Sequence, residues 1–172
     1  GMVKFYKACR GKGIKPIVSC DIWLENAEDR DKPYRLLLTA KNREGYRRLC
    51  ELLTRAFTYN QYRGRAEIKR AWLEEGDNSN LLCLSGAHLG DVGMAFANGN
   101  ADEARSRAEY WARLFPGAFY LELQRLDNPQ VENILQSTLW LAGETGLPVV
   151  ATHPIQFMDP DDFKAHEARV CI

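Results

Sequence analysis

The sequence predicts an α/β fold in which a mostly parallel sheet is covered by helices. Short apolar segments rich in leucine and β-branched residues alternate with longer segments whose apolar residues recur every three or four positions. Strands that alternate with amphipathic helices are typical of such sheets. The length of 172 residues suits one domain with its own hydrophobic core.

The first predicted elements are a helix and two strands. Residues 3–12 predict a helix that ends at Gly13, because glycine readily adopts the left-handed conformation that often follows a helix. Residues 14–24 and 34–40 are largely apolar and predict strands. The charged segment 25–32 between them predicts a solvated loop.

Capping residues mark the later helices. Asn42 predicts the N-cap of a helix with apolar residues at helical spacing, and Asn100 followed by Glu103 resembles a capping box. Asn128-Pro129 predicts a further helix start, and Gly146 its end. After the Asn42 helix we expect helices at residues 68–75, 100–115, 128–146 and 159–172. Strands at 81–84, 118–123 and 148–152 alternate with these helices.

Composition and charge exclude several classes of protein. Lys and Arg together number 23, as do Asp and Glu, so no overall field favours nucleic acid or membranes. No apolar segment approaches the roughly 18 residues of a membrane span and no signal peptide begins the chain, which predicts a cytoplasmic protein without a membrane partner. Five widely spaced cysteines without a CxxC pair predict reduced thiols.

Six segments of the chain, in order, resemble one protein family. They are GKGIKPIV at residues 11–18, LTAKNREGY at 38–46, LSG at 84–86, FYLELQ at 119–124, LPVVAT at 147–152 and AHEARV at 165–170. Together they resemble the polymerase and histidinol phosphatase (PHP) domain that begins the α subunit of bacterial DNA polymerase III. The resemblance covers essentially the whole chain.

The resemblance implies a partial, distorted (β/α)7 barrel that lacks its first two strands. Residues 1–172 would form a truncated PHP domain, with Gly1 a remnant of an expression tag and without the polymerase palm, fingers or thumb. A sheet without two of its strands has unpaired edges, so we expect pairing with another copy or rearranged ends.

The resemblance also implies a metal site with five testable positions. In this sequence they fall on Asp21, Arg35, Ala87, Pro154 and Gln156. The resemblance implies an acidic ligand at position 21, a histidine at position 35, a cysteine at position 87 and an Asp-x-His pair at positions 154 and 156. Of the residues present, only Asp21 can still act as a metal ligand. Divalent metals need several N, O or S donors around one point. We therefore expect a vestigial site and no cofactor in this chain, although the parent polymerase would use Mg²⁺.

Three histidines offer an alternative set of ligands. His88 and His153 lie one residue from family metal positions, and a shift of one residue along extended backbone points a side chain to the opposite face. His166 lies on a predicted helix and favours a surface role. Polar packing or exposure is the better interpretation of all three.

Two further pairs of residues could indicate a catalytic site. Cys20 beside Asp21 has no histidine base near it in sequence and predicts a packed thiol rather than a nucleophile. Glu122 and Asp127 flank a strand end and could form an acid–base pair, although nothing in the sequence indicates a substrate.

A basic and aromatic segment predicts contact with DNA or a protein partner. Its residues are Arg55, Tyr59, Tyr62, Arg63, Arg65, Lys69 and Arg70. Cations can follow a phosphate backbone while aromatic rings stack on bases. A mobile solvated loop has the same composition and remains the alternative.

The resemblance implies a scaffold within a replicative DNA polymerase. The expected partners are the rest of the polymerase α subunit, the separate proofreading exonuclease subunit and, through the parent protein, DNA. One alternative is an active metal-dependent phosphoesterase or 3′–5′ exonuclease of the same superfamily, against which Arg35, Ala87, Pro154 and Gln156 argue. Another is an unrelated α/β binding domain.

Overall fold

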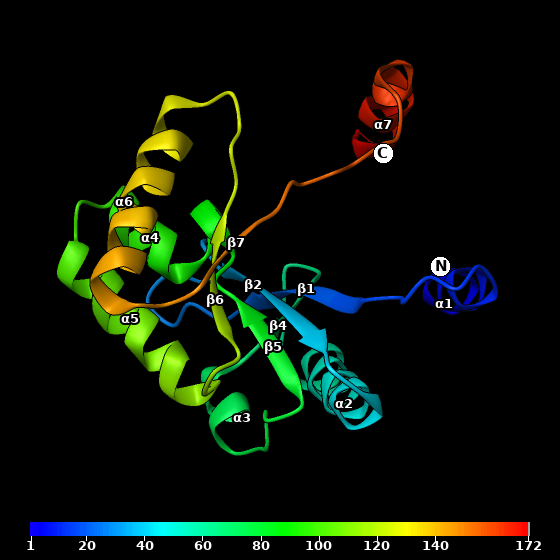
Figure 1. The fold of residues 1–172 in the computed structure, drawn as a ribbon, viewed down its shortest axis with the longest axis horizontal. Helices are drawn as coiled ribbons and strands as arrows, with labels where there is room; N and C mark the ends of the chain where they lie inside the picture. The colour runs from blue at the N-terminus through cyan, green and yellow to red at the C-terminus, as the bar shows by residue number, and fades with distance from the viewer. Residues whose placement is uncertain (172) are drawn as a thin grey trace.

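The computed structural model describes residues 1–171 and contains a seven-stranded sheet with the order β3-β4-β1-β2-β5-β6-β7 (Figure 1). The strands are β1 (Val18–Leu24), β2 (Tyr34–Ala40), β3 (Gln61–Tyr62), β4 (Arg65–Ile68), β5 (Leu81–Leu84), β6 (Phe119–Leu123) and β7 (Val149–Ala151). The helices are α1 (Met2–Gly11), α2 (Arg43–Tyr59), α3 (Arg70–Glu74), α4 (Asp91–Ala97), α5 (Ala101–Leu114), α6 (Pro129–Thr145) and α7 (Phe163–Val170). The α/β class predicted from the sequence is confirmed.

The sheet is mixed, so the prediction of a mostly parallel sheet was wrong. The pairs β1–β4, β5–β6 and β6–β7 are parallel, whereas β1–β2, β2–β5 and β3–β4 are antiparallel. Strands β1 and β2 are joined by a loop without a helix, and such a direct connection between neighbours produces an antiparallel pair. The parallel pairs β5–β6 and β6–β7 are joined through helices, as predicted.

Caps and turns set the ends of the helices. The Asn42 side chain accepts hydrogen bonds from the amides of Glu44 and Gly45, and the Asn128 side chain accepts from the first-turn amides of α6. Gly146 ends α6 with φ of 69°, in the left-handed region that favours glycine. The predicted caps at Asn42, Asn128 and Gly146 are confirmed. They could be predicted because each cap depends on residues close together in the chain.

Four features of the fold differ from the sequence-based prediction. The β3–β4 hairpin turns through Arg63 and Gly64, both with positive φ, and its strands are too short to show alternation. Helix α4 was also missed. Strand β1 begins at Val18 rather than at residue 14, and the final helix is a short 3-10 turn followed by α7. The part of that prediction at residue 172 lies outside the described residues.

The core lies between the sheet and the helices packed on it. Helix α2 packs against β2 and β4, and helices α5 and α6 pack against β6. The largest fully buried side chains include Trp111, Phe115, Phe119 and Leu36. Helices α1 and α7, both within the described range, bury no residue and stand off from the sheet (Figure 1). No helix within residues 1–171 is long and apolar enough to cross a membrane.

Candidate functional site

Two carboxylates and one guanidinium meet on the face of the sheet. Arg35 on β2 donates to the Oδ1 atom of Asp21 on the neighbouring strand β1, with an Nε–Oδ1 distance of 2.6 Å. Its Nη1 lies 3.1 Å from the Oε2 atom of Glu122 on β6. The side chains of Glu122 and Arg35 are 0% and 15% exposed, whereas that of Asp21 is 61% exposed. We call these three residues the Arg35 cluster.

Glu122 is surrounded by donors in addition to Arg35. The backbone amide of Gly86 donates to its Oε2 at 3.1 Å, and the Thr152 hydroxyl donates to its Oε1 at 2.5 Å. The Gln124 amide donates to Oε1 at 3.2 Å and also to the Thr152 hydroxyl. A buried carboxylate is tolerated only when it is charge-compensated and hydrogen-bonded. In this cluster the buried Glu122 carboxylate is compensated by the Arg35 guanidinium and by three hydrogen-bond donors.

The structure places the five family metal positions in two groups. Asp21 and Arg35 are in direct contact. Ala87 is buried three residues after the carboxyl end of β5. Pro154 and Gln156 are exposed in the segment that leads from β7 away from the sheet toward α7 (Figure 1). Among residues 1–171, no group of three or more His, Cys, Asp or Glu side chains could hold a metal ion. The donor set does not fit a metal cluster, because a guanidinium lies between the two carboxylates nearest that position.

The sequence raised Glu122 and Asp127 only as a disfavoured acid–base pair, and the structure gives Glu122 different partners. Asp127 is exposed, whereas Glu122 is buried and bound to Arg35, so the two do not form an acid–base pair. Reasoning from the sequence also missed Gly86, Gln124 and Thr152. Gly86, Gln124 and Thr152 each end one of the segments that carry the family resemblance, and Gln124 lies two residues from Glu122 on one strand and therefore points to the same face.

The half-buried thiol of Cys20 lies next to this cluster. Burial and then the negative charge of Asp21 raise the pKa of Cys20. Because the thiolate is the nucleophilic form, a raised pKa lowers reactivity at neutral pH. The structure therefore supports the interpretation of Cys20 as a packed thiol.

His88 lies beside the Arg35 cluster, and its Nδ1 atom is buried without a hydrogen-bond partner among the described residues. Burial, and then the nearby charge of Arg35, lower the pKa of His88, while Glu122 acts in the opposite direction. The neutral imidazole is therefore the favoured form in the folded protein.

We expect the protein to lose stability as the pH falls below about 6.5, partly because of His88. The pKa is lower in the folded than in the unfolded state, so unfolded chains take up the proton first and unfolding becomes more favourable. Above the unfolded pKa this contribution to stability is fully present. Denaturant unfolding at a series of pH values measures the slope, and His88→Gln should reduce it. The matched control is His153→Gln at an exposed position, and an equal effect of both variants would contradict the assignment.

The basic and aromatic segment is largely neutralised by contacts within the fold. Arg63 pairs with Asp31 at 2.7 Å, and Arg65 pairs at 2.7 Å with Glu67, whose side chain is 0% exposed. Tyr62 lies beneath the guanidinium groups of Arg63 and Arg65 in the same hairpin. Contact of this segment with DNA stays a prediction.

The remaining members of the segment lie away from the hairpin. Arg55 pairs with Glu75, Arg70 pairs with the buried Asp91, Lys69 is half-buried, and Tyr59 is 78% exposed. In the hairpin Tyr62 contacts Arg63 and Arg65, while Arg55 and Arg70 are bound to carboxylates elsewhere in the fold.

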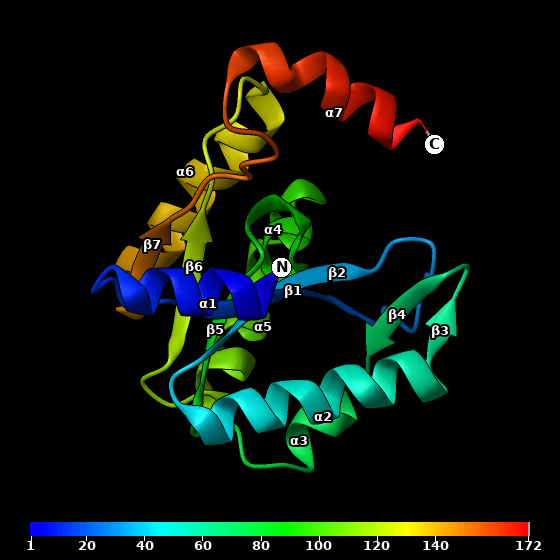
Figure 2. The ribbon, with the colours of Figure 1, turned by 90° about the vertical axis from the view of Figure 1, so that its right-hand side faces the viewer.

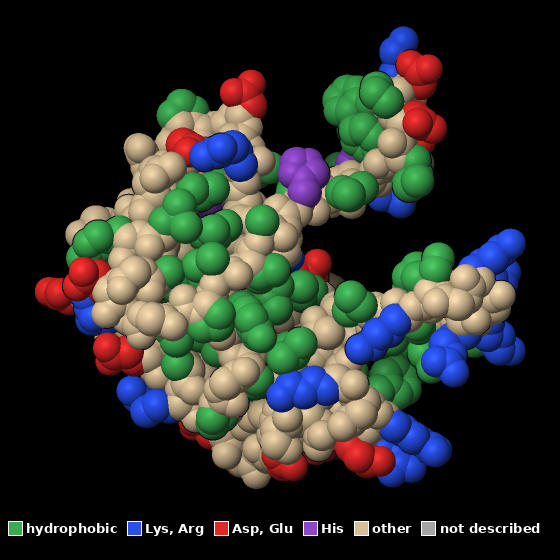
Figure 3. All heavy atoms as spheres, viewed as in Figure 1, with side chains coloured by type: hydrophobic (Ala, Val, Ile, Leu, Met, Phe, Trp, Pro, Cys, Tyr) green, Lys and Arg blue, Asp and Glu red, His purple; other side chains and the backbone are tan. Residues whose placement is uncertain are grey.

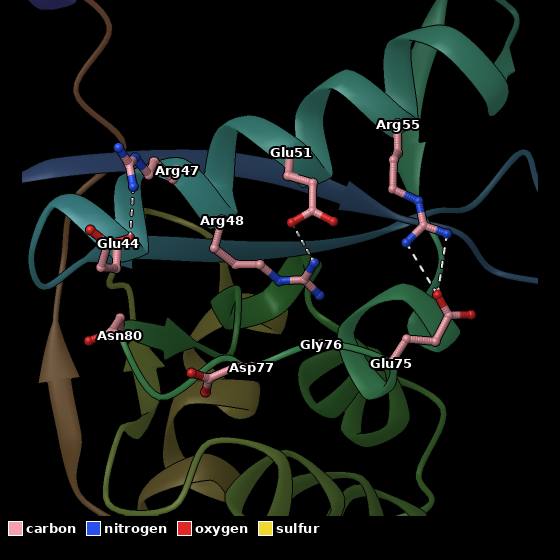
Figure 4. A pocket seen from close by; sticks show the side chains of 9 residues that line it. All are labelled: Glu44, Arg47, Arg48, Glu51, Arg55, Glu75, Gly76, Asp77 and Asn80. Carbon is pink, nitrogen blue, oxygen red and sulfur yellow. Dashed lines mark hydrogen bonds and ion pairs between the residues drawn. The ribbon is translucent and has the colours of Figure 1, made fainter.

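A charged groove of about 490 Å³ lies between α2 and the loop after α3 (Figure 4). Its cations are paired with its own carboxylates, namely Arg47 with Glu44, Arg48 with Glu51 and Arg55 with Glu75. Arg48 also donates to the carbonyl of Trp72 at 2.5 Å and joins α2 to α3. The contacts of Arg48 and Arg55 therefore hold α2 against α3 and the residue that follows it.

This mixed α/β domain belongs to the PHP domain family. The family model, described as the PHP domain, matches residues 1–126. The chain is 56% identical over 174 aligned residues to the DNA polymerase III subunit alpha of Neisseria meningitidis serogroup A. It is 45% identical to the protein of that name from Pseudomonas fluorescens and 39% identical to that from Escherichia coli K12. The matches cover 99–100% of this chain but only 14–15% of the length of these relatives.

Proposed function

We propose that the chain is a segment of the PHP domain of a replicative DNA polymerase III α subunit and acts as a scaffold. The observation that supports this role most directly is the Arg35 guanidinium between Asp21 and Glu122, which supplies the positive charge that a metal ion would otherwise provide. The likeness of the whole chain to polymerase α subunits supports the identity of the parent protein.

Within the parent, the chain would form part of a distorted seven-stranded PHP barrel. The βα units from β5 to β7, with their parallel pairing, support this arrangement. The exposed side chains of Ser19 and Asp21 and the 38% exposed ring of Trp23 line an open face of β1, which further strands could cover. Residues 1–172 would therefore be one part of a domain, beside a polymerase part that uses Mg²⁺.

The scaffold would support the polymerase part of the α subunit and provide a docking surface for the proofreading exonuclease subunit, in the bacterial cytoplasm. The exposed helix α7 supports a role in docking, because it presents apolar side chains to solvent (Phe163 at 50% and Val170 at 68%). Co-elution of the chain with the exonuclease subunit of the same organism would test this contact.

Metal analysis tests the scaffold against an active phosphoesterase or 3′–5′ exonuclease. After incubation with Zn²⁺ or Mn²⁺ and dialysis, we expect well below one equivalent of bound metal and no hydrolysis of a chromogenic phosphodiester. Primer extension with the same preparation should add no nucleotides. Arg35 is the reason, since it places a permanent cation against both carboxylates.

The control compares two exposed aspartates. Asp21→Ala removes the one remaining family ligand, and Asp161→Ala removes a carboxylate far from the cluster. Near-stoichiometric metal that is lost in Asp21→Ala but kept in Asp161→Ala, with hydrolysis lost in parallel, would show an active metal site and overturn the proposal.

A further inference from the structure

Positive charge is segregated at one end of a protein whose total charge is zero. The first twenty residues contain five of the 23 basic residues and none of the 23 acidic ones. Figure 3 shows these Lys and Arg side chains gathered over α1 and the neighbouring surface. Such asymmetry indicates a local field that the overall charge conceals.

This charge surrounds a groove of about 650 Å³ that is lined by residues of α1 and of the start of α2. Figure 2 shows α1 running above the first turns of α2. Its walls come from α1, the segment that enters β1, and the connection from β2 to α2. The charged residues that line it are Lys7, Arg10, Lys15, Lys41 and Arg43, and the apolar and aromatic ones include Met2, Val3, Tyr6, Pro16 and Tyr46. Every charged side chain in the lining is therefore a cation.

The cations of this groove are not neutralised by the fold. Within residues 1–171, none of the five forms an ion pair, and Lys41 donates to the carbonyl of Ser79. The segment 55–70 differs, because four of its arginines are bound to carboxylates. Five cations without an ion pair therefore gather at the α1 groove, whereas in the segment that the sequence indicated only Lys69 forms no ion pair among residues 1–171.

Two tyrosine rings lie among these cations, on opposite walls. Tyr6 belongs to α1 and is 43% exposed, and Tyr46 belongs to α2 and is 39% exposed. Exposed rings beside free cations are what proteins use to stack unpaired bases while binding the phosphate backbone.

We infer that this α1 groove binds single-stranded nucleic acid, with phosphates against the five cations and bases against Tyr6 and Tyr46. The concave shape favours an extended polyanion over a lipid surface, since a planar bilayer cannot contact both walls of a groove. The tyrosine rings favour a single strand over a duplex, because paired bases offer no open ring faces along the strand. This inference does not depend on the metal content of the Arg35 cluster.

Fluorescence anisotropy of the full 172-residue chain with a labelled oligothymidylate tests the inference. With five cations engaged, we expect binding to weaken about 100-fold between about 50 and about 200 mM salt. The double variant Lys7→Gln/Arg10→Gln should weaken binding roughly 25-fold at about 0.1 M salt, with a shallower salt dependence. Tyr6→Leu/Tyr46→Leu keeps apolar side chains and should still weaken binding about tenfold or more, because ring stacking is lost.

The matched control is Lys4→Gln/Lys12→Gln, which removes the same charge from the same N-terminal segment at positions that do not line the groove. Equal losses in the two charge variants would show attraction by the whole segment and overturn the groove assignment. Equal affinity for a duplex of the same sequence would overturn the stacking role of the tyrosines. Binding to phosphatidylglycerol vesicles with the same sensitivity to Lys7→Gln/Arg10→Gln, but not to the oligonucleotide, would assign the groove to lipid and overturn the inference.

Discussion

Replacing Arg35 with methionine is expected to lower the free energy of unfolding by about 3–5 kcal/mol. The substitution keeps much of the aliphatic volume but leaves the carboxylate of Glu122, whose side chain is 0% exposed, without its cation. Removal of one partner from a buried ion pair costs more than the pair itself contributes, because the remaining charge is still desolvated. The loss of the Asp21 contact should add little, since Asp21 is 61% exposed and water replaces the arginine. Chemical denaturation at pH 7 measures the effect.

Two comparisons make this prediction specific to the buried pair. Arg125→Met removes an exposed arginine that pairs with Glu132, and we expect a loss of no more than about 1 kcal/mol. The double variant Arg35→Met/Glu122→Gln removes the uncompensated charge and should recover a large part of the stability lost in Arg35→Met. Similar small losses in Arg35→Met and Arg125→Met would show that Glu122 is not held by Arg35 in solution.

Replacing Trp111 with alanine is the second large expected loss, about 3–5 kcal/mol. The Trp111 side chain is fully buried in α5 and makes an edge contact with Tyr110 at a centroid distance of 4.9 Å. Its Nε1 donates to both carboxylate oxygens of Asp91 at 3.0 Å, and Asp91 is itself buried. The alanine variant thus creates a cavity and leaves the Asp91 carboxylate with Arg70 as its one side-chain partner within residues 1–171.

Trp140 on α6 provides the control for this substitution. It is 51% exposed and lies 5.8 Å from the guanidinium of Arg105, so Trp140→Ala should cost roughly 0.5–1 kcal/mol. Trp111→Phe separates the two contributions, because it keeps an aromatic ring in the core but removes the donor to Asp91. We expect an intermediate loss of about 1–3 kcal/mol for it. Equal thermal stability of the two alanine variants would contradict the assignment of Trp111 to the core.

Much of the fold follows from local signals. Asn42, Asn128 and Gly146 end or begin helices where the sequence predicted, since a cap depends on residues within one helical turn. The hairpin β3–β4 was not predictable in the same way. Its turn uses Arg63 with φ of 50° before Gly64, and arginine is not among the residues that usually indicate such a turn.

The candidate site was predicted only in part. Asp21 and Arg35 were named as two of the five metal positions that the family resemblance implies, and the structure shows them in contact with each other. Glu122 lies 87 residues from Arg35 in the chain, and no local pattern connects them. Their contact requires β2 and β6 to lie on either side of β5 in the sheet.

The sequence by itself determined the alternation of helices and strands, the caps and the family, because these depend on residue spacing and on motifs read along the chain. Only the tertiary structure decided the directions of the strands, the bridge from Arg35 to Glu122, and which cations are free. Arg55, Arg63 and Arg70 find carboxylates at least 20 residues away in the chain. Lys7 and Arg10, in contrast, lie in a segment without acidic residues and find none within the described chain. Charge pairing depends on distance in space, and a sheet brings together residues that sequence separation alone cannot relate.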